Sequence, residues 1–162
     1  MGKAYLSLGS NVAPERNLAS AVHALRERFD ALRVSPFYRT TAIGFEGPDF
    51  LNAAAVIESD LDVHALNDWL HALEDAHGRD RSGPRFGDRT LDIDIVFFDD
   101  LVTGGPGQVL RIPRPELKHA FVLKPLVDIA PGFVDPLSGK TLEELWAQSP
   151  EREVPMQLVE NF

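Results

Sequence analysis

Two kinds of apolar pattern follow one another along this sequence, and their order restricts the possible folds more than any other feature. Some segments alternate apolar and other residues, which predicts β-strands. Residues 3–10 and 91–98 show this alternation, and residues 32–40 and 50–59 are two further predicted strands. Residues 14–29 and 61–77 instead repeat apolar side chains every three or four positions, as amphipathic helices do. The resulting order, β-α-β-β-α-β, predicts an α/β (α+β) fold with a ferredoxin-like core whose helices lie on one face of the sheet.

A C-terminal extension continues beyond this core from about Leu101, with a Gly/Pro-rich turn and two short helical runs. A length of 162 residues fits one domain, so we expect a single domain over residues 1–162. The letters SGKT, ending at Thr141, resemble the end of a phosphate-binding loop, but Val134 stands where that motif requires glycine. A helix capped by Thr141, with Glu144 completing a capping box, explains the segment better.

The last strand of the predicted core carries two carboxylates where apolar residues are expected. Asp92 and Asp94 lie two positions apart and therefore point to the same face of the strand. The opposite face is predicted to hold Leu91, Ile93, Ile95 and Phe97. Carboxylates this close raise each other's pKa unless a cation or basic groups compensate their charge. The pattern therefore predicts a positive partner for this strand.

Several arginines lie just upstream, on a loop rich in glycine and proline. They are Arg79, Arg81, Arg85 and Arg89. Guanidinium groups suit phosphate oxygens, and carboxylates suit hard metal ions such as Mg²⁺. The combination predicts a site for a metal-bound phosphate compound. The alternative is a solvated loop followed by a strand end at the surface.

Charge and composition exclude several classes of partner. The formal net charge is -9, whereas a protein that binds duplex nucleic acid needs a basic surface. The sequence contains no cysteine, which excludes disulfides, thiol nucleophiles and zinc–thiolate sites. It shows neither a signal peptide nor a long apolar span. We therefore expect a cytoplasmic protein without nucleic-acid or membrane partners.

Four segments match a known enzyme family in order and spacing. They read LGSN, FYRTTAIGFEGPDFLNAA, GRDRSGPRFGDRTLDIDIVFF and IPRPELKHAFVLKPLVDIAP. In these segments the chain resembles the 6-hydroxymethyl-7,8-dihydropterin pyrophosphokinases of folate biosynthesis, and the likeness spans nearly the whole chain. The resemblance implies a ferredoxin-like fold and Mg-dependent transfer of a diphosphate from ATP to the hydroxymethyl group of the pterin, leaving AMP. We further expect a monomer.

The resemblance implies catalytic roles around the reacting phosphates. Asp92 and Asp94 match the ligands of two magnesium ions that bridge the triphosphate. Two carboxylates suffice because Mg²⁺ keeps several waters and also binds substrate phosphates. Arg79 and Arg89 match arginines that neutralise charge on the transferring group. Such transfer depends chiefly on positioning and electrostatics, so the lack of an evident general base is acceptable.

Further positions resemble the two substrate sites of the family. A pterin is a flat polar heteroaromatic that needs stacking faces and hydrogen bonds at its edge. The matching pterin positions are Thr40, Ile43 through its backbone, Phe50, Asn52 and Phe121. The matching ATP positions are Glu74, Arg81, Ile95, Arg111 and Arg114. On pattern alone, Phe50 and Phe121 would be ordinary core residues, and Glu74 would be an exposed residue of its helix.

Several residues depart from the family pattern, mainly on the nucleotide side. Arg114 stands where relatives have a histidine that contacts ATP, and His119 stands where an arginine is usual. Arg111 and Arg114 could supply the positive charge lost there. On the arginine loop, Phe86 replaces a tryptophan and Asp88 replaces a proline.

Two other functions stay open. Ferredoxin-like sheets with paired aspartates also occur in polymerase palms and cyclases, so another two-metal phosphoryl or nucleotidyl transferase is the second hypothesis. A non-catalytic protein that binds a pterin or a nucleotide is the third, motivated by the Arg114 and His119 departures. The pterin-type residues and the acidic net charge favour the pyrophosphokinase.

Overall fold

The computed structural model describes residues 1–40, 49–78, 90–104 and 110–159. Its strands are β1 (Gly2–Ser10), β2 (Asp30–Val34), β3 (Phe37–Thr40), β4 (Phe50–Ser59), β5 (Asp92–Phe98) and β6 (Gln157–Val159). Its helices are α1 (Pro14–Arg28), α2 (Val63–Ala76), α3 (Ala120–Ile129) and α4 (Leu142–Ala147). A short 3-10 helix, η1 (Pro115–Lys118), precedes α3.

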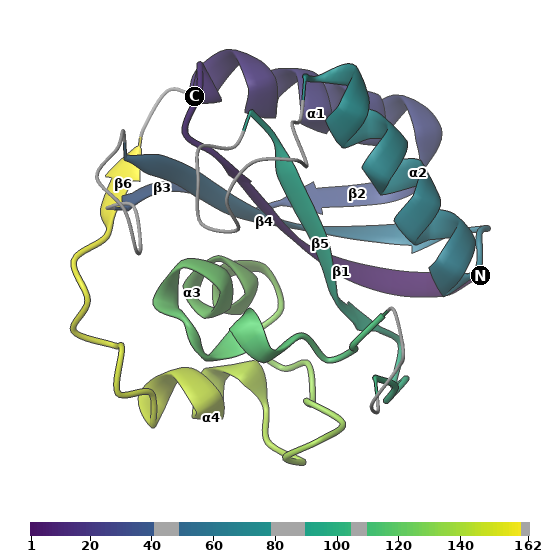
Figure 1. Ribbon diagram of the computed structural model, residues 1–162. Helices are drawn as coiled ribbons and strands as arrows, with labels where there is room; N and C mark the ends of the chain where they lie inside the picture. The colour runs from purple at the N-terminus through teal and green to yellow at the C-terminus, as the bar shows by residue number, and fades with distance from the viewer. Residues whose placement is uncertain (41–48, 79–89, 105–109, 160–162) are drawn as a thin grey trace.

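The strands form one antiparallel sheet (Figure 1). Its order is β5-β1-β4-β3-β6, and β2 also pairs with β4. β1 lies between β4 and β5, and it pairs with β4 along its whole length. With α1 following β1 and α2 following β4, this is the β-α-β-β-α-β arrangement that the apolar patterns predict. The ferredoxin-like core is therefore confirmed, and β6 widens its sheet beyond β3.

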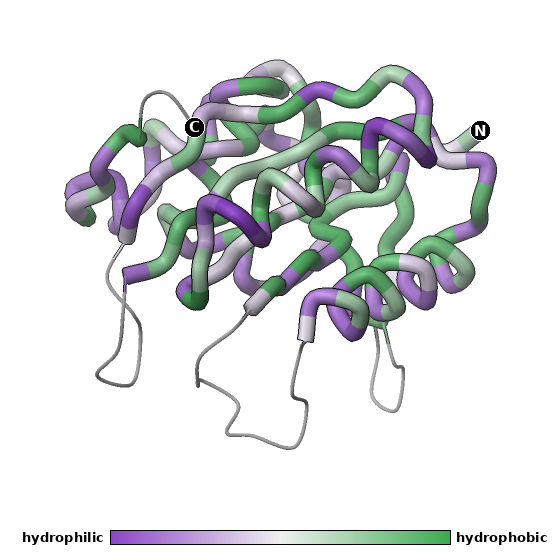
Figure 2. Tube along the Cα trace, turned by 90° about the horizontal axis from the view of Figure 1, so that it is seen from above, coloured by the Kyte–Doolittle hydropathy of each residue, from purple (hydrophilic) through white to green (hydrophobic). Residues whose placement is uncertain are grey.

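The helices α1 and α2 cover one face of the sheet and lie above it in Figure 1. Pro14 occupies the first turn of α1, where its missing N–H costs nothing. Asp62 caps α2 by accepting a hydrogen bond of 2.8 Å from the Ala65 N–H. The core beneath both helices includes Leu6, Leu18, Leu51, Leu66 and Ile93. Figure 2 shows the hydropathy along the chain, with many apolar residues in the segments that run through the middle of the molecule.

The C-terminal extension covers the opposite face with α3 and α4, below the sheet in Figure 1. α3 packs against β4, β3 and β1, and α4 packs on α3. The core on this side contains the rings of Tyr5, Phe97 and Phe133. The Tyr38 hydroxyl donates a hydrogen bond to Asp128 and ties the end of α3 to β3. The sequence predicts both short helices but not the face that they cover.

The second predicted strand is split into β2 and β3, so the prediction of one continuous strand is wrong. The break falls at Ser35 and Pro36. Proline has no N–H for a strand ladder. At this break the Ser35 hydroxyl accepts a hydrogen bond of 2.8 Å from the Ala54 N–H of β4.

The strand with the acid pair contains an irregularity that moves one residue to the other face. Ile95 pairs with Leu6, whereas Phe97 pairs with Tyr5, the residue just before Leu6 in β1. Val96 is therefore an extra residue, a β-bulge. Phe97 joins the core under α3 and not the α1/α2 core, where strict alternation wrongly places it.

Two helix ends carry residues that suit their positions. Gly78 follows α2 with a φ of 84°, the left-handed conformation that glycine adopts readily at a helix end. Thr141 and Glu144 form the predicted capping box at the start of α4. None of the helices in the described part of the chain combines the length and apolar character needed to span a bilayer.

Candidate active site

The acid pair lies on the sheet face that α3 covers, next to a glycine on β1. Asp92 pairs across the strands with Gly9, and Gly9 pairs on its other side with Asn52 of β4. Residues paired directly in this way point to the same face of an antiparallel sheet. Because neighbouring strands lie about 4.8 Å apart, the backbones at Asp92 and Asn52 are roughly 10 Å apart. The residue between them has no side chain.

Asp94 follows on the same face and has a basic neighbour from the extension. Its Oδ1 lies 3.7 Å from Nη1 of Arg114, whose Nε lies 3.2 Å from Oε2 of Glu116. The backbone N–H of Arg114 donates a hydrogen bond of 3.1 Å to the carbonyl of Val96, the bulge residue. The bulge thus brings Arg114 beside the acid pair, where the sequence predicts a positive partner.

Burial and charge oppose each other in this group. Burial raises the pKa of the Asp94 carboxyl well above its ordinary value, Asp92 raises it further, and Arg114 lowers it. Burial lowers the pKa of the Arg114 guanidinium, but the charges of Asp94 and Glu116 outweigh that effect and raise it. The arginine therefore does not cancel the repulsion between the acids, and a further cation would relieve it.

The two carboxylates fit a magnesium site. They supply hard oxygen ligands from one face of a strand, and Mg²⁺ needs one or two such ligands when phosphates and waters complete its coordination. Asp92 and Asp94 are the described residues that would hold it. In the described segments, no three acidic, histidine or cysteine side chains gather around a common centre. The donor set therefore suits an ion that substrate oxygens help to bind.

Three residues predicted to bind the pterin lie together beside Gly9. Nδ2 of Asn52 donates a hydrogen bond of 2.7 Å to Oγ1 of Thr40, and Asn52 is only 5 % exposed. A Cβ added to Gly9 would lie 3.1 Å from Oδ1 of Asn52 and 3.9 Å from Cδ1 of Phe50. The glycine therefore keeps this part of the sheet face free of a side chain from β1.

Phe121, another predicted pterin residue, stands in the first turn of α3. Its ring is partly buried against the core under α3. The same ring stacks on the His119 ring, with centroids 5.2 Å apart and planes 10° apart. At the other end of α3, Asp128 accepts the hydrogen bond from Tyr38 on β3, the strand that also carries Thr40.

Two residues predicted on the nucleotide side are buried. Glu74 is 2 % exposed, and its Oε2 accepts a hydrogen bond of 2.8 Å from the Ile93 N–H. The expectation of an exposed helix residue is therefore wrong, because β5 ends the sheet and its outward N–H needs a partner. Ile95 is 2 % exposed and packs in the α1/α2 core, so only its main chain could contact a nucleotide.

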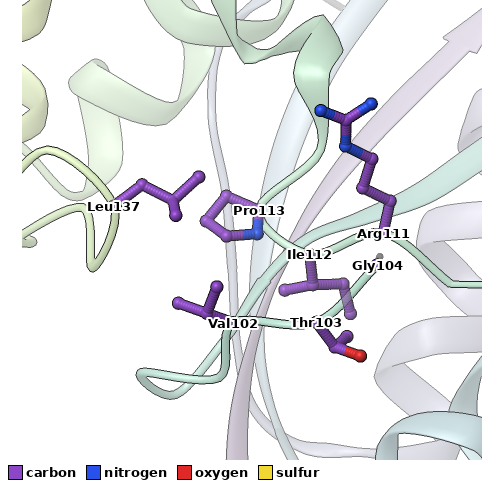
Figure 3. Close-up of a pocket in the computed structure, with 7 residues that line it drawn as sticks. All are labelled: Val102, Thr103, Gly104, Arg111, Ile112, Pro113 and Leu137. Carbon is purple, nitrogen blue, oxygen red and sulfur yellow. The ribbon is translucent and has the colours of Figure 1, made fainter. Parts of the chain in front are cut away.

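Arg111, a further predicted nucleotide residue, lines a cavity of about 410 Å³ in the extension (Figure 3). The lining residues are Val102, Thr103, Gly104, Arg111, Ile112, Pro113 and Leu137. Figure 3 shows the Leu137 side chain pointing toward Pro113. Of the predicted site residues that the structure describes, the cavity lining contains Arg111 alone.

The other predicted site residues lie outside the described parts of the chain. They are Ile43, Arg79, Arg81 and Arg89, and Arg85 lies in the same undescribed range. Their roles stay predictions.

Sequence reasoning does not identify two residues that border this site. Gly9 lies in the LGSN segment, and a glycine near the end of an alternating strand is its only signal. Glu151 contacts Nδ1 of His119 at 2.9 Å. No local pattern marks Glu151, because 32 residues separate the two partners.

The fold and the site together define a class of protein. A ferredoxin-like sheet carries, on one face, an acid pair with an arginine beside it and a hydrogen-bonded Asn–Thr pair beside a phenylalanine. The first group suits a metal-bound phosphate chain, and the second suits the edge and face of a flat polar ring. These features are those of a small-molecule phosphotransferase.

Comparison with known proteins specifies the family. The sequence profile of the 7,8-dihydro-6-hydroxymethylpterin-pyrophosphokinase (HPPK) family matches residues 5–131. A 2-amino-4-hydroxy-6-hydroxymethyldihydropteridine pyrophosphokinase from Synechocystis sp. is 38% identical over 149 residues, which cover 90% of this chain and 75% of that protein. The protein of the same name from Pseudomonas aeruginosa is 37% identical over 158 residues, covering 91% and 92%. The chain belongs to the 7,8-dihydro-6-hydroxymethylpterin-pyrophosphokinase family.

Solved structures share the fold. Plasmodium falciparum HPPK-DHPS with SDX-DHP matches 94% of this chain with a TM-score of 0.70 and 15% identity. A structure of HPPK-DHPS in complex with substrates also gives a TM-score of 0.70, with 14% identity. The chain spans 44% of the length of each of these two solved chains.

Proposed function

We propose that this protein transfers a diphosphate group from ATP to 6-hydroxymethyl-7,8-dihydropterin, giving AMP and the pterin diphosphate in folate biosynthesis. The family match carries the proposal, because residues 5–131 include every described site residue from Gly9 to Phe121. In the reaction, the hydroxymethyl oxygen bonds to the β-phosphorus of ATP and loses its proton to solvent. The bond between that phosphorus and the oxygen bridging to the α-phosphate breaks, and AMP leaves with that oxygen.

Asp92 and Asp94 are proposed to hold magnesium beside the ATP phosphates. Bound magnesium would neutralise charge on the triphosphate and orient it for in-line displacement. Arg114, at 3.7 Å from Asp94, adds a fixed positive charge at the same place. Arg79 and Arg89 are proposed to stabilise the transferring diphosphate, because such transfer depends on positioned positive charge.

The pterin is proposed to lie over the sheet face at Gly9. Asn52 and Thr40, already hydrogen-bonded to each other, would bind its polar edge, with the Ile43 backbone as a further contact. Phe50 and Phe121 would stack on its rings. The separation of roughly 10 Å between Asp92 and Asn52 leaves space for the hydroxymethyl group and the transferring phosphate between them.

The nucleotide is proposed to contact the main chain of β5 at Ile95. Arg81, Arg111 and Arg114 would supply positive charge around ATP. Glu74 would contribute indirectly, because its bond to the Ile93 N–H supports the strand that carries the acid pair.

Residues 1–162 are proposed to form one domain that acts as a monomer in the cytoplasm. Support for one domain comes from β6, which lies near the end of the sequence and pairs with β3. The packing of α3 against β4 also supports it. Light scattering during size-exclusion chromatography tests the monomer, because a dimer would elute at twice the mass of 17.9 kDa.

Incubation with Mg²⁺, ATP and 6-hydroxymethyl-7,8-dihydropterin tests the proposed reaction. We expect AMP and the pterin diphosphate in equal amounts, and no product after EDTA treatment. Formation of ADP would indicate an ordinary kinase, and cyclic AMP would indicate another two-metal enzyme. Binding of the pterin without turnover would favour a non-catalytic binding protein.

A further inference from the structure

Glu151 reaches back from the C-terminal part of the chain to the residues just before Phe121. Its Oε2 lies 2.9 Å from Nδ1 of His119, and its Oε1 accepts a hydrogen bond of 3.1 Å from the Ala120 N–H. An ionised carboxylate only accepts hydrogen bonds, so Nδ1 of His119 carries the proton. The two carboxylate oxygens thus accept hydrogen bonds from two successive residues, His119 and Ala120. Each of these bonds has a charged acceptor.

The His119 ring in turn supports the ring of Phe121. The two planes differ by 10° and the centroids are 5.2 Å apart, which is a stacked arrangement. Holding Nδ1 fixes the plane of the imidazole, and the imidazole plane then restricts the orientation of the phenyl ring. Phe121 is only partly buried, so the core under α3 does not fix this ring alone.

We infer that Glu151 is a positioning residue for the pterin site, acting on Phe121 through His119. The inference rests on the proposed role of Phe121 as a stacking partner of the pterin. Glu151 lies beyond residues 5–131, the part of the chain that the family profile matches. The C-terminal part of the chain would therefore supply a residue that sets pterin affinity, although it contains none of the predicted substrate contacts.

The fixed orientation of the Phe121 ring explains why Glu151 would affect pterin binding. A ring held in one orientation before binding loses little freedom when a flat heterocycle stacks on it. Without Glu151, His119 and Phe121 can adopt other rotamers, and ligand binding must then restrict them. Affinity for the pterin should fall, whereas ATP binding and the rate at saturating pterin should not change.

Glu151→Ala tests the inference, with Glu153→Ala as the matched control. Glu153 is an exposed carboxylate two residues further along the chain. We expect Glu151→Ala to raise the pterin Kd and KM about tenfold, as for loss of bonds to a charged acceptor. The Kd of a non-hydrolysable ATP analogue and kcat should stay within about twofold, and Glu153→Ala should change none of these constants.

Two more variants keep the test decisive if Glu151→Ala folds poorly. His119→Ala should give the same selective loss, and Glu151→Gln should recover part of the affinity because its amide oxygen still accepts one bond. In a Phe121→Ala background, Glu151→Ala should weaken pterin binding no further.

The outcomes separate this inference from the proposed function. A lower melting temperature of Glu151→Ala with unchanged pterin affinity would overturn the inference and make Glu151 a tether of the C-terminal segment. Equal loss for the pterin and for the ATP analogue would also overturn it. If Phe121→Ala itself leaves pterin affinity unchanged, the proposed stacking role of Phe121 is wrong.

Discussion

Asn52 donates a hydrogen bond of 2.7 Å from Nδ2 to Oγ1 of Thr40, which joins two neighbouring strands on the face that carries the acid pair. Thr40→Val removes the acceptor and leaves a buried amide donor without it, at a cost of about 1–3 kcal/mol. Because the proposed pterin edge meets this pair, pterin affinity should fall by a similar free energy. Calorimetry with the pterin and with an ATP analogue checks this, and equal loss for both ligands would contradict it.

Gly9→Ala should weaken pterin binding more than it destabilises the fold. The new Cβ would lie 3.1 Å from Oδ1 of Asn52, closer than most Cβ contacts, and 3.9 Å from the Phe50 ring. The Asn52 amide must then shift by a few tenths of an ångström, which disturbs its bond to Thr40. Gly132→Ala is the matched control, because its Cβ would meet nothing within 4 Å. A loss of pterin affinity confined to Gly9→Ala supports the site, and equal affinities for both variants would count against it.

Asp94→Asn should make the metal-free protein less sensitive to rising pH. Burial and Asp92 raise the pKa of Asp94 above its ordinary value of 3.8, so the folded state binds more protons than the unfolded state between those two pKa values. The free energy of unfolding therefore falls as pH rises through that interval, and Asn removes this loss. Urea unfolding in EDTA at several pH values checks this. The free energy of unfolding of the variant should increase relative to that of the wild type as pH rises.

Added magnesium should make the wild type more stable relative to a variant that lacks both carboxylates. The ion would stabilise the wild type and leave a variant with both Asp92→Asn and Asp94→Asn unchanged, while turnover of that variant is lost. Asp100→Asn, an exposed acid just after β5, is the control. If the double variant instead melts far below the wild type in EDTA and keeps Mg-dependent turnover, the acids are structural.

Arg114→Ala should raise the ATP dissociation constant and leave the pterin constant unchanged. Its guanidinium lies 3.7 Å from Asp94, so it adds positive charge where the triphosphate is proposed to bind. A charge-assisted bond of this kind contributes about 1.5–3 kcal/mol, which corresponds to a rise of about tenfold or more. Lys118→Ala, on the same 3-10 helix segment, is a control for net charge. An unchanged ATP constant would show that Arg114 only balances the acid pair.

The elements that the sequence predicts well are those whose own side chains repeat with a clear period. β4 occupies the predicted residues 50–59, and its residues 51–57 are buried without a break. The capping box of Thr141 and Glu144 also follows from local chemistry alone. The acid pair is found for the same reason, since alternation places Asp92 and Asp94 on one face whatever the rest of the fold does.

The predictions that fail for Phe97 and Glu74 depend on partners far away in the sequence. Phe97 changes face because a bulge inserts Val96 against β1, and alternation within β5 does not report it. Glu74 is buried because the outer edge of β5 needs an acceptor, which its own helix pattern does not indicate. Arg114 finds Asp94 only after the chain has passed through the extension, so its distance to the acid cannot be read from spacing.

The bulge at Val96 matters for the site and not for the fold. A strand lacking that one residue would pair regularly with β1 and would still present Asp92, Asp94 and Phe97 on the α3 side. It would lose the carbonyl that receives the Arg114 N–H. Deletion of Val96 would therefore keep the acid pair on its face and remove a main-chain contact that helps to place Arg114 beside it. The charge balance of the site thus depends on the number of residues in β5 as well as on their identity.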